Sequence, residues 1–156
     1  MKGRSAGSGR RGGGLLLGLL VLPAVLTGCG GSTDGSTAPQ ASATAGPGVG
    51  TVTTADDGVQ EITLQTQDDY VFTPDTFTVD PGTVRLTVVN VGKDLTHNFR
   101  FTPDEGPAPI ESEIPLLTAG QEVTIEFEVA EPGDYPFECS FHIQLDQVGT
   151  MTVRSR

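Results

Sequence analysis

The chain has 156 residues, enough for one domain with appendages, and its formal net charge is −11. All twenty acidic residues follow Cys29, where only five basic residues accompany them, so this part of the chain carries −15. Such an excess of negative charge argues against a nucleic-acid partner, because phosphate backbones attract Lys and Arg. The nine aromatic residues lie between Tyr70 and Phe141, which places the expected core in the C-terminal two thirds.

The N-terminus has the pattern of an export signal. Its basic residues are Lys2, Arg4, Arg10 and Arg11. Twelve mostly apolar residues follow at 15–26, a length typical of signal peptides and too short to span a bilayer comfortably. Leu26-Thr27-Gly28-Cys29 resembles a bacterial lipobox, which implies cleavage before Cys29 and a lipid on its thiol. We therefore expect a lipoprotein signal peptide at 1–28 and an extracytoplasmic, membrane-anchored protein. An ordinary secretory signal is the alternative, and Arg10-Arg11 leaves a twin-arginine route open beside the general one.

Residues 29–58 have the composition of a flexible, lipid-anchored linker. They are rich in Gly, Ser, Thr, Ala and Pro, and no apolar periodicity runs through them. A segment of this kind buries too little apolar surface to offset the entropy lost on ordering. The sequence thus predicts that the folded domain begins near Val59.

The domain at 59–156 is expected to be all-β. Apolar and polar residues alternate along 123–129, and shorter alternating runs occur around 62–64, 77–79 and 84–88. Alternation of this kind is typical of half-buried strands. Asp80-Pro81-Gly82 and Glu131-Pro132-Gly133-Asp134 carry turn residues, and the Pro-rich, acidic stretch at 102–115 is expected to be a loop with at most a helical turn. Short strands at this spacing predict a β-sandwich.

Strand parity places two chemically active residues on the core face. His97 shares a face with Phe99 and Phe101, and Cys139 shares one with Tyr135 and Phe137. His142 follows Cys139 by three residues, close enough to turn back toward it. If these strand ends meet at one pole of the sandwich, both histidines of the chain and its one cysteine after Cys29 come together.

A thiolate, two imidazoles and a weak fourth group form the ligand set of a blue-copper site. Taken singly, each residue has an ordinary structural role: a buried core cysteine, a strand-end histidine and an exposed loop histidine. Zinc would also accept one Cys and two His, but it favours four strong ligands. The fourth candidate here is an amide or a thioether, so the donor set favours one type 1 copper ion.

These motifs resemble the cupredoxins, the blue-copper family of plastocyanins, azurins and stellacyanins. The resemblance rests on three stretches: 90–92 leading to His97-Asn98-Phe99, the run 133–142, and 149–153. It implies a Greek-key β-sandwich, copper bound by His97, Cys139 and His142, and one-electron transfer. It also implies that Asn98 ties the ligand loops together and directs its backbone N–H at the thiolate.

The resemblance leaves the axial ligand to be chosen between two residues. Plastocyanins and azurins use a methionine five residues after the second histidine, and that position here is Gln147. Met151 lies on the core face of the final strand with Gly149 and Val153. We therefore expect Gln147 to be axial, as glutamine is in stellacyanins, with Met151 or no axial ligand as the alternatives.

The expected function is that of an electron carrier, not an enzyme. Further copper centres would need more histidines than the two present. The expected partner is a redox protein, such as a cytochrome or a membrane oxidase, docking a monomer on an apolar rim. The rim candidates are Phe141, Ile143 and Leu145, with Pro107 and Pro109 as further candidates. Copper sequestration or delivery without redox turnover is the alternative function.

Overall fold

The computed structural model describes residues 46–156, and strands form the framework of this part of the chain. The expected signal peptide, Cys29 and the first half of the expected linker lie outside the described residues. In chain order the elements are β1 (Thr53–Thr54), β2 (Gln60–Thr66), β3 (Phe72–Thr73), β4 (Thr76–Val79), β5 (Gly82–Asn90), β6 (His97–Phe101), β7 (Ile114–Leu117), β8 (Glu122–Val129), β9 (Gly133–Glu138), the 3-10 turn η1 (Ile143–Leu145) and β10 (Val148–Val153). Within residues 46–156, no helix has the length and apolar character needed to cross a membrane.

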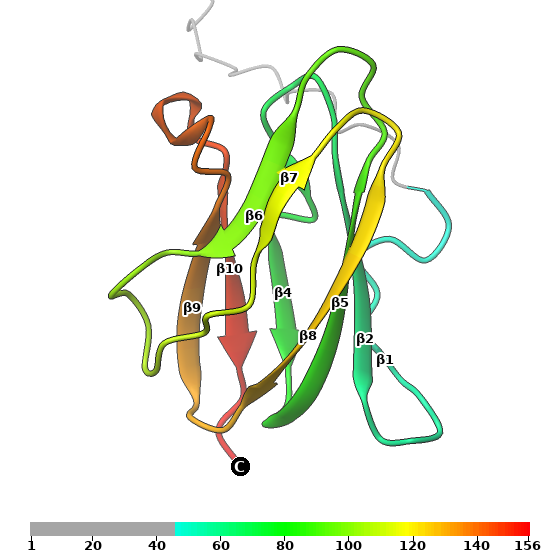
Figure 1. The fold of residues 1–156 in the computed structure, drawn as a ribbon. Helices are drawn as coiled ribbons and strands as arrows, with labels where there is room; N and C mark the ends of the chain where they lie inside the picture. The colour runs from blue at the N-terminus through cyan, green and yellow to red at the C-terminus, as the bar shows by residue number, and fades with distance from the viewer. Residues whose placement is uncertain (1–45) are drawn as a thin grey trace, which may run out of the picture. The chain divides into compact units, whose positions relative to one another are not determined.

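The strands form two sheets, which confirms the β-sandwich predicted from the sequence. One sheet has the order β1-β2-β5-β8, with β3 also paired to β2, and the other has the order β4-β10-β9-β6-β7. Each sheet mixes parallel and antiparallel neighbours: β2 runs parallel to β5, and β4 runs parallel to β10. Figure 1 shows the two layers, with η1 and the C-terminus at opposite ends of the sandwich.

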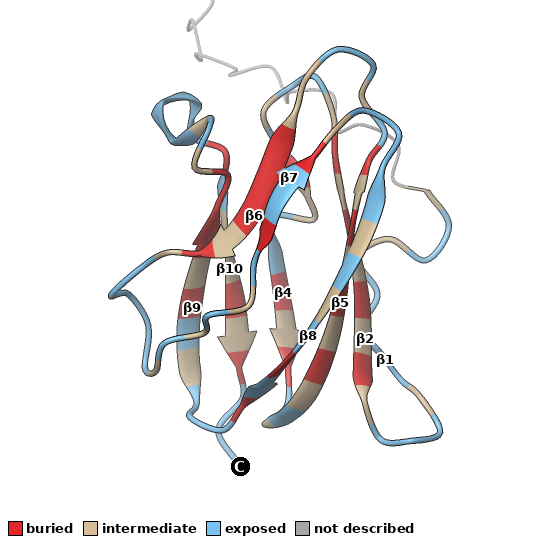
Figure 2. Ribbon diagram, in the orientation of Figure 1, coloured by how far each residue is buried: buried red, intermediate tan, exposed pale blue. Residues whose placement is uncertain are grey.

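Alternating side chains explain why these segments are strands. In β5, Val84, Leu86 and Val88 are fully buried, while the residues between them are partly exposed. β2 shows the same period of two, visible as alternating colours along both strands in Figure 2. A period of two sends successive side chains to opposite faces, so each strand contributes one face to the core. At about 25 cal/mol per Å² of buried apolar surface, this core is the main source of stability.

Aromatic rings fill the core between the two sheets. The Phe99 ring lies 5.1 Å from the Phe137 ring, and Phe72 packs edge-on against Phe137 at 5.5 Å, measured between ring centroids. Phe99 and Phe137 lie on neighbouring strands that lead toward His97 and Cys139. The packed rings therefore fix the strands from which two candidate ligands project.

The folded domain begins earlier than the expected Val59. Val49 forms a bridge with Thr63, β1 pairs with β2, and Val52 packs against the core. These residues lack an alternating pattern of their own and gain order by pairing with the edge of an existing sheet. The loop expected at 102–115 also ends early, because the buried Ile114 begins β7.

The sheet topology brings the candidate ligands to one end of the sandwich. β9 lies between β6 and β10 and runs antiparallel to both. The end of an antiparallel strand lies beside the beginnings of its neighbours. Cys139, directly after β9, is thus brought beside His97 at the start of β6 and beside the turn that leads into β10.

Candidate metal centre

A short loop between β9 and β10 holds three of the four predicted ligands. Its two ends are joined because the backbone N–H of Cys139 donates to the carbonyl oxygen of Gln147 at 3.0 Å. Inside the loop, the N–H of His142 donates to the carbonyl oxygen of Cys139 at 3.0 Å, and the N–H of Leu145 donates to that of His142 at 2.8 Å. These tight turns bend the chain so that His142 faces Cys139.

The ligand atoms of His97, Cys139 and His142 all lie within 4.8 Å of one another. The Sγ atom of Cys139 lies 3.4 Å from Nδ1 of His142 and 4.0 Å from Nδ1 of His97. Nitrogen and sulfur donors bound to one ion at about 2.0 and 2.3 Å, at near-tetrahedral angles, would be separated by roughly 3.6 Å. The observed distances bracket that value, so the three donors fit a single metal ion.

The side-chain oxygen of Gln147 lies beside the Nδ1 atoms of both histidines. This Oε1 atom lies 2.9 Å from Nδ1 of His97 and 3.0 Å from Nδ1 of His142. Met151, the alternative axial ligand, is instead a fully buried core residue of β10. The structure therefore brings together His97, Cys139, His142 and Gln147, and it leaves Met151 in the core.

The centre is buried except at one histidine. His97, Cys139 and Gln147 are 0% exposed, whereas His142 is half-buried. Burial lowers the pKa of His97, and the nearby His142 also lowers it, while the contact with Gln147 and the Gln67 backbone opposes these effects. Although the Gln67 backbone lies near this ring, Nε2 of His97 has no hydrogen-bond partner with acceptable geometry. A neutral imidazole with Nδ1 facing the centre is the form that binds metal.

Asn98 connects the two ligand-bearing segments. Its backbone N–H donates to Sγ of Cys139 at 3.4 Å. Its side-chain Oδ1 accepts the N–H of Ser140 at 2.7 Å, and its Nδ2 donates to Oγ of Ser140 at 2.8 Å. Asn98 thus makes both contacts that the family resemblance implied, one to the sulfur and one between the loops. An N–H directed at the sulfur stabilises negative charge there.

Three residues of the segment 66–70 support the centre from outside, two by contacting its residues and one by holding a loop, and sequence reasoning missed all of them. Thr66 Oγ1 accepts the Nε2–H of Gln147 at 2.7 Å. The Tyr70 ring packs edge-on against His142 with 5.0 Å between centroids, and Tyr70 has a left-handed backbone with φ of 59°. Asp68 holds the loop before His97 in place. No motif marks these residues, because each contacts a partner far away in the chain.

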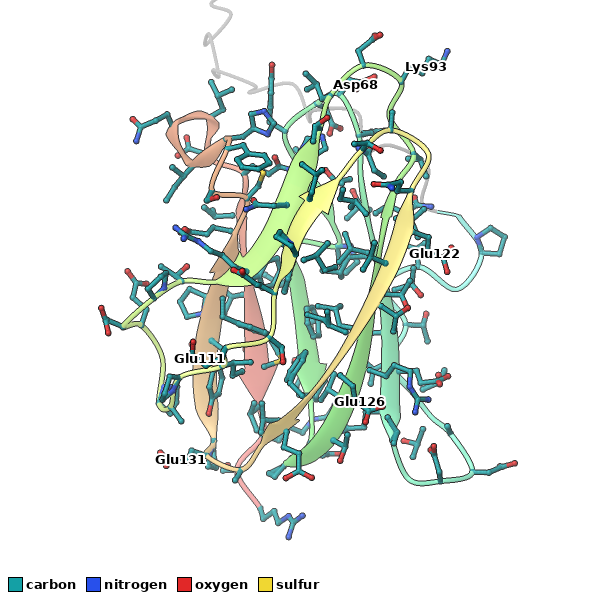
Figure 3. All side chains as sticks on the ribbon, viewed as in Figure 1. Asp68, Lys93, Glu111, Glu122, Glu126 and Glu131 are labelled. Atoms are coloured by element: carbon teal, nitrogen blue, oxygen red, sulfur yellow. The ribbon has the colours of Figure 1, made fainter. Side chains whose placement is uncertain are left out.

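The Asp68 carboxylate accepts three backbone N–H groups. They belong to Lys93 at 2.9 Å, Leu95 at 2.9 Å and Asp94 at 3.2 Å. These hydrogen bonds, that of Lys93 most strongly, lower the pKa of Asp68. Figure 3 shows Asp68 and Lys93 side by side at the same end of the sandwich. The carboxylate fixes the loop that delivers His97 to the centre.

An apolar rim lies beside the half-buried His142. Phe141 is 52% exposed, Ile143 40% and Leu145 52%, and the Phe141 ring centroid is 6.5 Å from that of His142. Pro107 is not part of this rim, since it packs on Gly133 at the far end of β9. Pro109 lines a surface hollow with residues 100–105. The rim therefore consists of the segment after Cys139, without the two prolines.

Comparison with known proteins finds a family model and relatives that match this chain. Residues 40–153 match the model of the family described as "Cupredoxin-like domain". The chain is 34% identical over 101 residues to the chloroplastic plastocyanin minor isoform of Arabidopsis thaliana, covering 60% of this chain and 57% of that protein. It is 35% identical over 86 residues to plastocyanin A/B of Petroselinum crispum, covering 53% of this chain and 87% of that protein. The chain thus spans just over half the length of the first of these relatives.

A solved structure shows the same fold. It is that of dithionite-reduced auracyanin from the photosynthetic bacterium Roseiflexus castenholzii, with a TM-score of 0.54 and 23% identity. The match covers 61% of this chain and 97% of the auracyanin chain. At this identity the likeness concerns the fold alone. The cofactor expected from the sequence, one copper ion, agrees with the family and with the His–Cys–His group.

Proposed function

This chain belongs to the cupredoxin-like family, and from that premise we propose that it is a type 1 copper protein that carries single electrons. The observation that supports this most directly is the convergence of two Nδ1 atoms, Sγ of Cys139 and Oε1 of Gln147. Copper in such a centre supplies one-electron chemistry by changing between Cu(II) and Cu(I). His97, Cys139 and His142 would hold it strongly, and Gln147 would be the weak axial ligand.

The surroundings favour rapid electron exchange over storage of metal. The ligands lie in closed turns and buried positions, so the donors move little when the charge of the centre changes. The half-buried His142 is the ligand nearest to solvent, and the exposed Phe141, Ile143 and Leu145 stand beside it. A small exposed apolar surface suits a transient partner, which releases the carrier after the transfer.

The proposed partner is a redox protein, such as a cytochrome or a membrane oxidase. The carrier acts as a monomer, and a partner with a basic surface would be attracted by the excess of acidic residues. Both histidines in the sequence belong to this one centre, which leaves no imidazoles for a second copper centre of an oxidase or reductase. This supports a carrier rather than an enzyme.

The proposal includes a lipid tether outside the cytoplasm. It rests on the sequence at 26–29, where Cys29 takes the acylated position of a lipobox-like motif. Anchoring would confine the carrier to the membrane surface, so that it meets membrane-bound partners by motion in two dimensions. This part of the proposal concerns residues outside the range that the structure describes.

The decisive experiment is the visible spectrum of the protein after addition of one equivalent of Cu(II). We expect an intense blue thiolate-to-copper band, which Cys139→Ala abolishes because the thiolate is the strongest donor. Met151→Leu serves as the control and keeps the band. The loaded protein should then exchange electrons with a cytochrome within a stopped-flow measurement. A colourless complex would contradict the type 1 centre, and tight copper binding without electron exchange would favour sequestration or delivery.

A further inference from the structure

The oxygen and the nitrogen of the Gln147 side-chain amide contact different groups. The oxygen faces the Nδ1 atoms of His97 and His142, and Nε2 donates to Oγ1 of Thr66 at 2.7 Å. Thr66 is 1% exposed and Gln147 is 0% exposed, so water does not replace this hydrogen bond. The orientation of the amide therefore depends on what accepts the Nε2 hydrogen.

Thr66 is a rigid acceptor. It ends β2, where its Cα lies opposite Asn90 of β5 on one side and Phe72 of β3 on the other. Its carbonyl oxygen accepts the N–H of Val91 at 2.9 Å. A β-branched side chain on a strand paired on both sides has little freedom at χ1, so the hydroxyl position is fixed by the sheet.

The hydrogen bond also joins the two sheets. Thr66 belongs to the sheet of β2, whereas Gln147 directly precedes β10 of the other sheet, and 81 residues separate them in the chain. The loop that carries Gln147 is also held by its own backbone hydrogen bonds and, at its beginning, by the Asn98 side chain bonded to Ser140. Thr66 thus provides a contact from the opposite sheet that orients the amide of Gln147.

We propose that Thr66 is the positioning residue that makes the amide oxygen of Gln147 the axial donor. This inference rests on the proposed copper function and deepens it. With Nε2 engaged by the hydroxyl, the oxygen is left free for the ion. Without that acceptor, a buried N–H remains unsatisfied, and the amide turns or withdraws to find a partner. The axial oxygen then binds more weakly.

The test compares Thr66→Val, which removes the hydroxyl at nearly constant volume, with Thr66→Ser, which keeps it. An oxygen donor stabilises Cu(II), so a weaker axial bond raises the reduction potential. We expect Thr66→Val to lower the preference for Cu(II) over Cu(I) by about five- to tenfold, the change expected from one ordinary hydrogen bond. Thr66→Ser should stay close to the native protein.

A double-mutant cycle separates positioning from packing. In a Gln147→Met background there is no amide to orient, so Thr66→Val should leave potential and spectrum nearly unchanged. An equal shift in both backgrounds would overturn the proposal, and so would no shift in the native background. Thr66→Ala provides a second variant if Thr66→Val does not fold.

A measurement without copper keeps the inference independent of the proposed function. In the metal-free protein, NMR follows hydrogen exchange at the Gln147 side-chain amide. We expect exchange to be slow in the native protein and in Thr66→Ser, and at least tenfold faster in Thr66→Val. Equal exchange in all three would refute the role of Thr66. If the native protein never turns blue while this pattern holds, the copper function fails and the orientation by Thr66 stands.

Discussion

Arg100 and Glu138 form an ion pair across β6 and β9, with Nη2 of the guanidinium 2.6 Å from Oε1 of the carboxylate. Nε of Arg100 also donates to Oε1 at 2.9 Å, and the Thr102 hydroxyl donates to Oε2 at 3.3 Å. Arg100 and Glu138 are directly opposite each other in the sheet. Arg100 follows His97 by three residues, and Glu138 immediately precedes Cys139. The pair therefore links the two strands that carry these ligands at the end nearest the centre.

The exposure of the two partners differs, and this predicts unequal effects of removing them. The Glu138 side chain is 2% exposed and that of Arg100 is 37% exposed. Arg100→Ala leaves a buried carboxylate without its counter-charge and should cost about 2–4 kcal/mol in free energy of unfolding. Glu138→Gln keeps an acceptor and leaves the half-exposed guanidinium, so about 1 kcal/mol is expected. Urea denaturation measures both values, and equal losses would contradict this account.

Added imidazole should rescue one histidine variant and not the other. His142 is half-buried at the edge of the centre, whereas His97 is fully buried. We expect His142→Gly to leave an opening that imidazole from solution fills, which restores a blue spectrum on addition of Cu(II). The matched variant His97→Gly should not respond, because the core closes its access. Rescue of both variants, or of His97→Gly alone, would show that solvent reaches the centre from the other side.

Replacement of the axial group should change the reduction potential. A thioether is a softer donor than an amide oxygen and stabilises Cu(II) less, so Gln147→Met should raise the potential. Met151→Leu alters only a core side chain of similar volume and should leave the potential nearly unchanged, with a stability loss below about 1.5 kcal/mol. Cyclic voltammetry measures the reduction potentials of both variants and of the native protein. The assignment is wrong if the Met151 variant shifts the potential and the Gln147 variant does not.

Because of Asp68, the stability of the domain should depend on pH in the acidic range. The pKa of Asp68 in the folded protein lies below the ordinary value of an aspartate, chiefly because of the N–H of Lys93 and then that of Leu95. The stabilisation is therefore complete above pH 4–5 and is lost as the pH falls through the lower folded value. In the metal-free protein, the Tm difference between native and Asp68→Asn should be constant near neutral pH and should shrink below about pH 4. A difference that persists at pH 2 would assign the effect to packing.

The tether is tested by fractionation of cells. If Cys29 carries the lipid, Cys29→Ser should release the protein from membranes, because serine offers no thiol for acylation. Cys139→Ser is the matched control, since it removes the other cysteine and leaves the N-terminal motif intact. Membrane association that is unchanged in Cys29→Ser would exclude acylation of this residue as the anchor.

The strands and the inward direction of His97 and Cys139 were predictable because burial on one face imposes a period of two. The same parity placed Met151 in the core, whereas the axial position of Gln147 was implied by the resemblance to the cupredoxins. These features depend only on residues close together in the sequence. The β-sandwich follows from them, since several half-buried strands need a second layer to cover their apolar faces.

The features that the sequence did not predict depend on residues far away in the chain. β1 and β3 have two residues each, too few to show any period, and they exist because β2 offers an edge. Thr66, Asp68 and Tyr70 lie in one short segment whose partners are between 25 and 81 residues away. Local patterns carry no information about which distant group a hydroxyl or a ring will meet.

The order of the ligands along the chain has a consequence for biogenesis. Cys139, His142 and Gln147 precede β10, which is an interior strand paired to both β4 and β9. During synthesis, His97 is therefore made long before the chain can surround an ion, and the sheet that carries the ligands closes only when Val148–Val153 has been added. The complete ligand set is therefore enclosed only after this strand is in place, so a blue spectrum of a preparation would also report that its chains extend through β10.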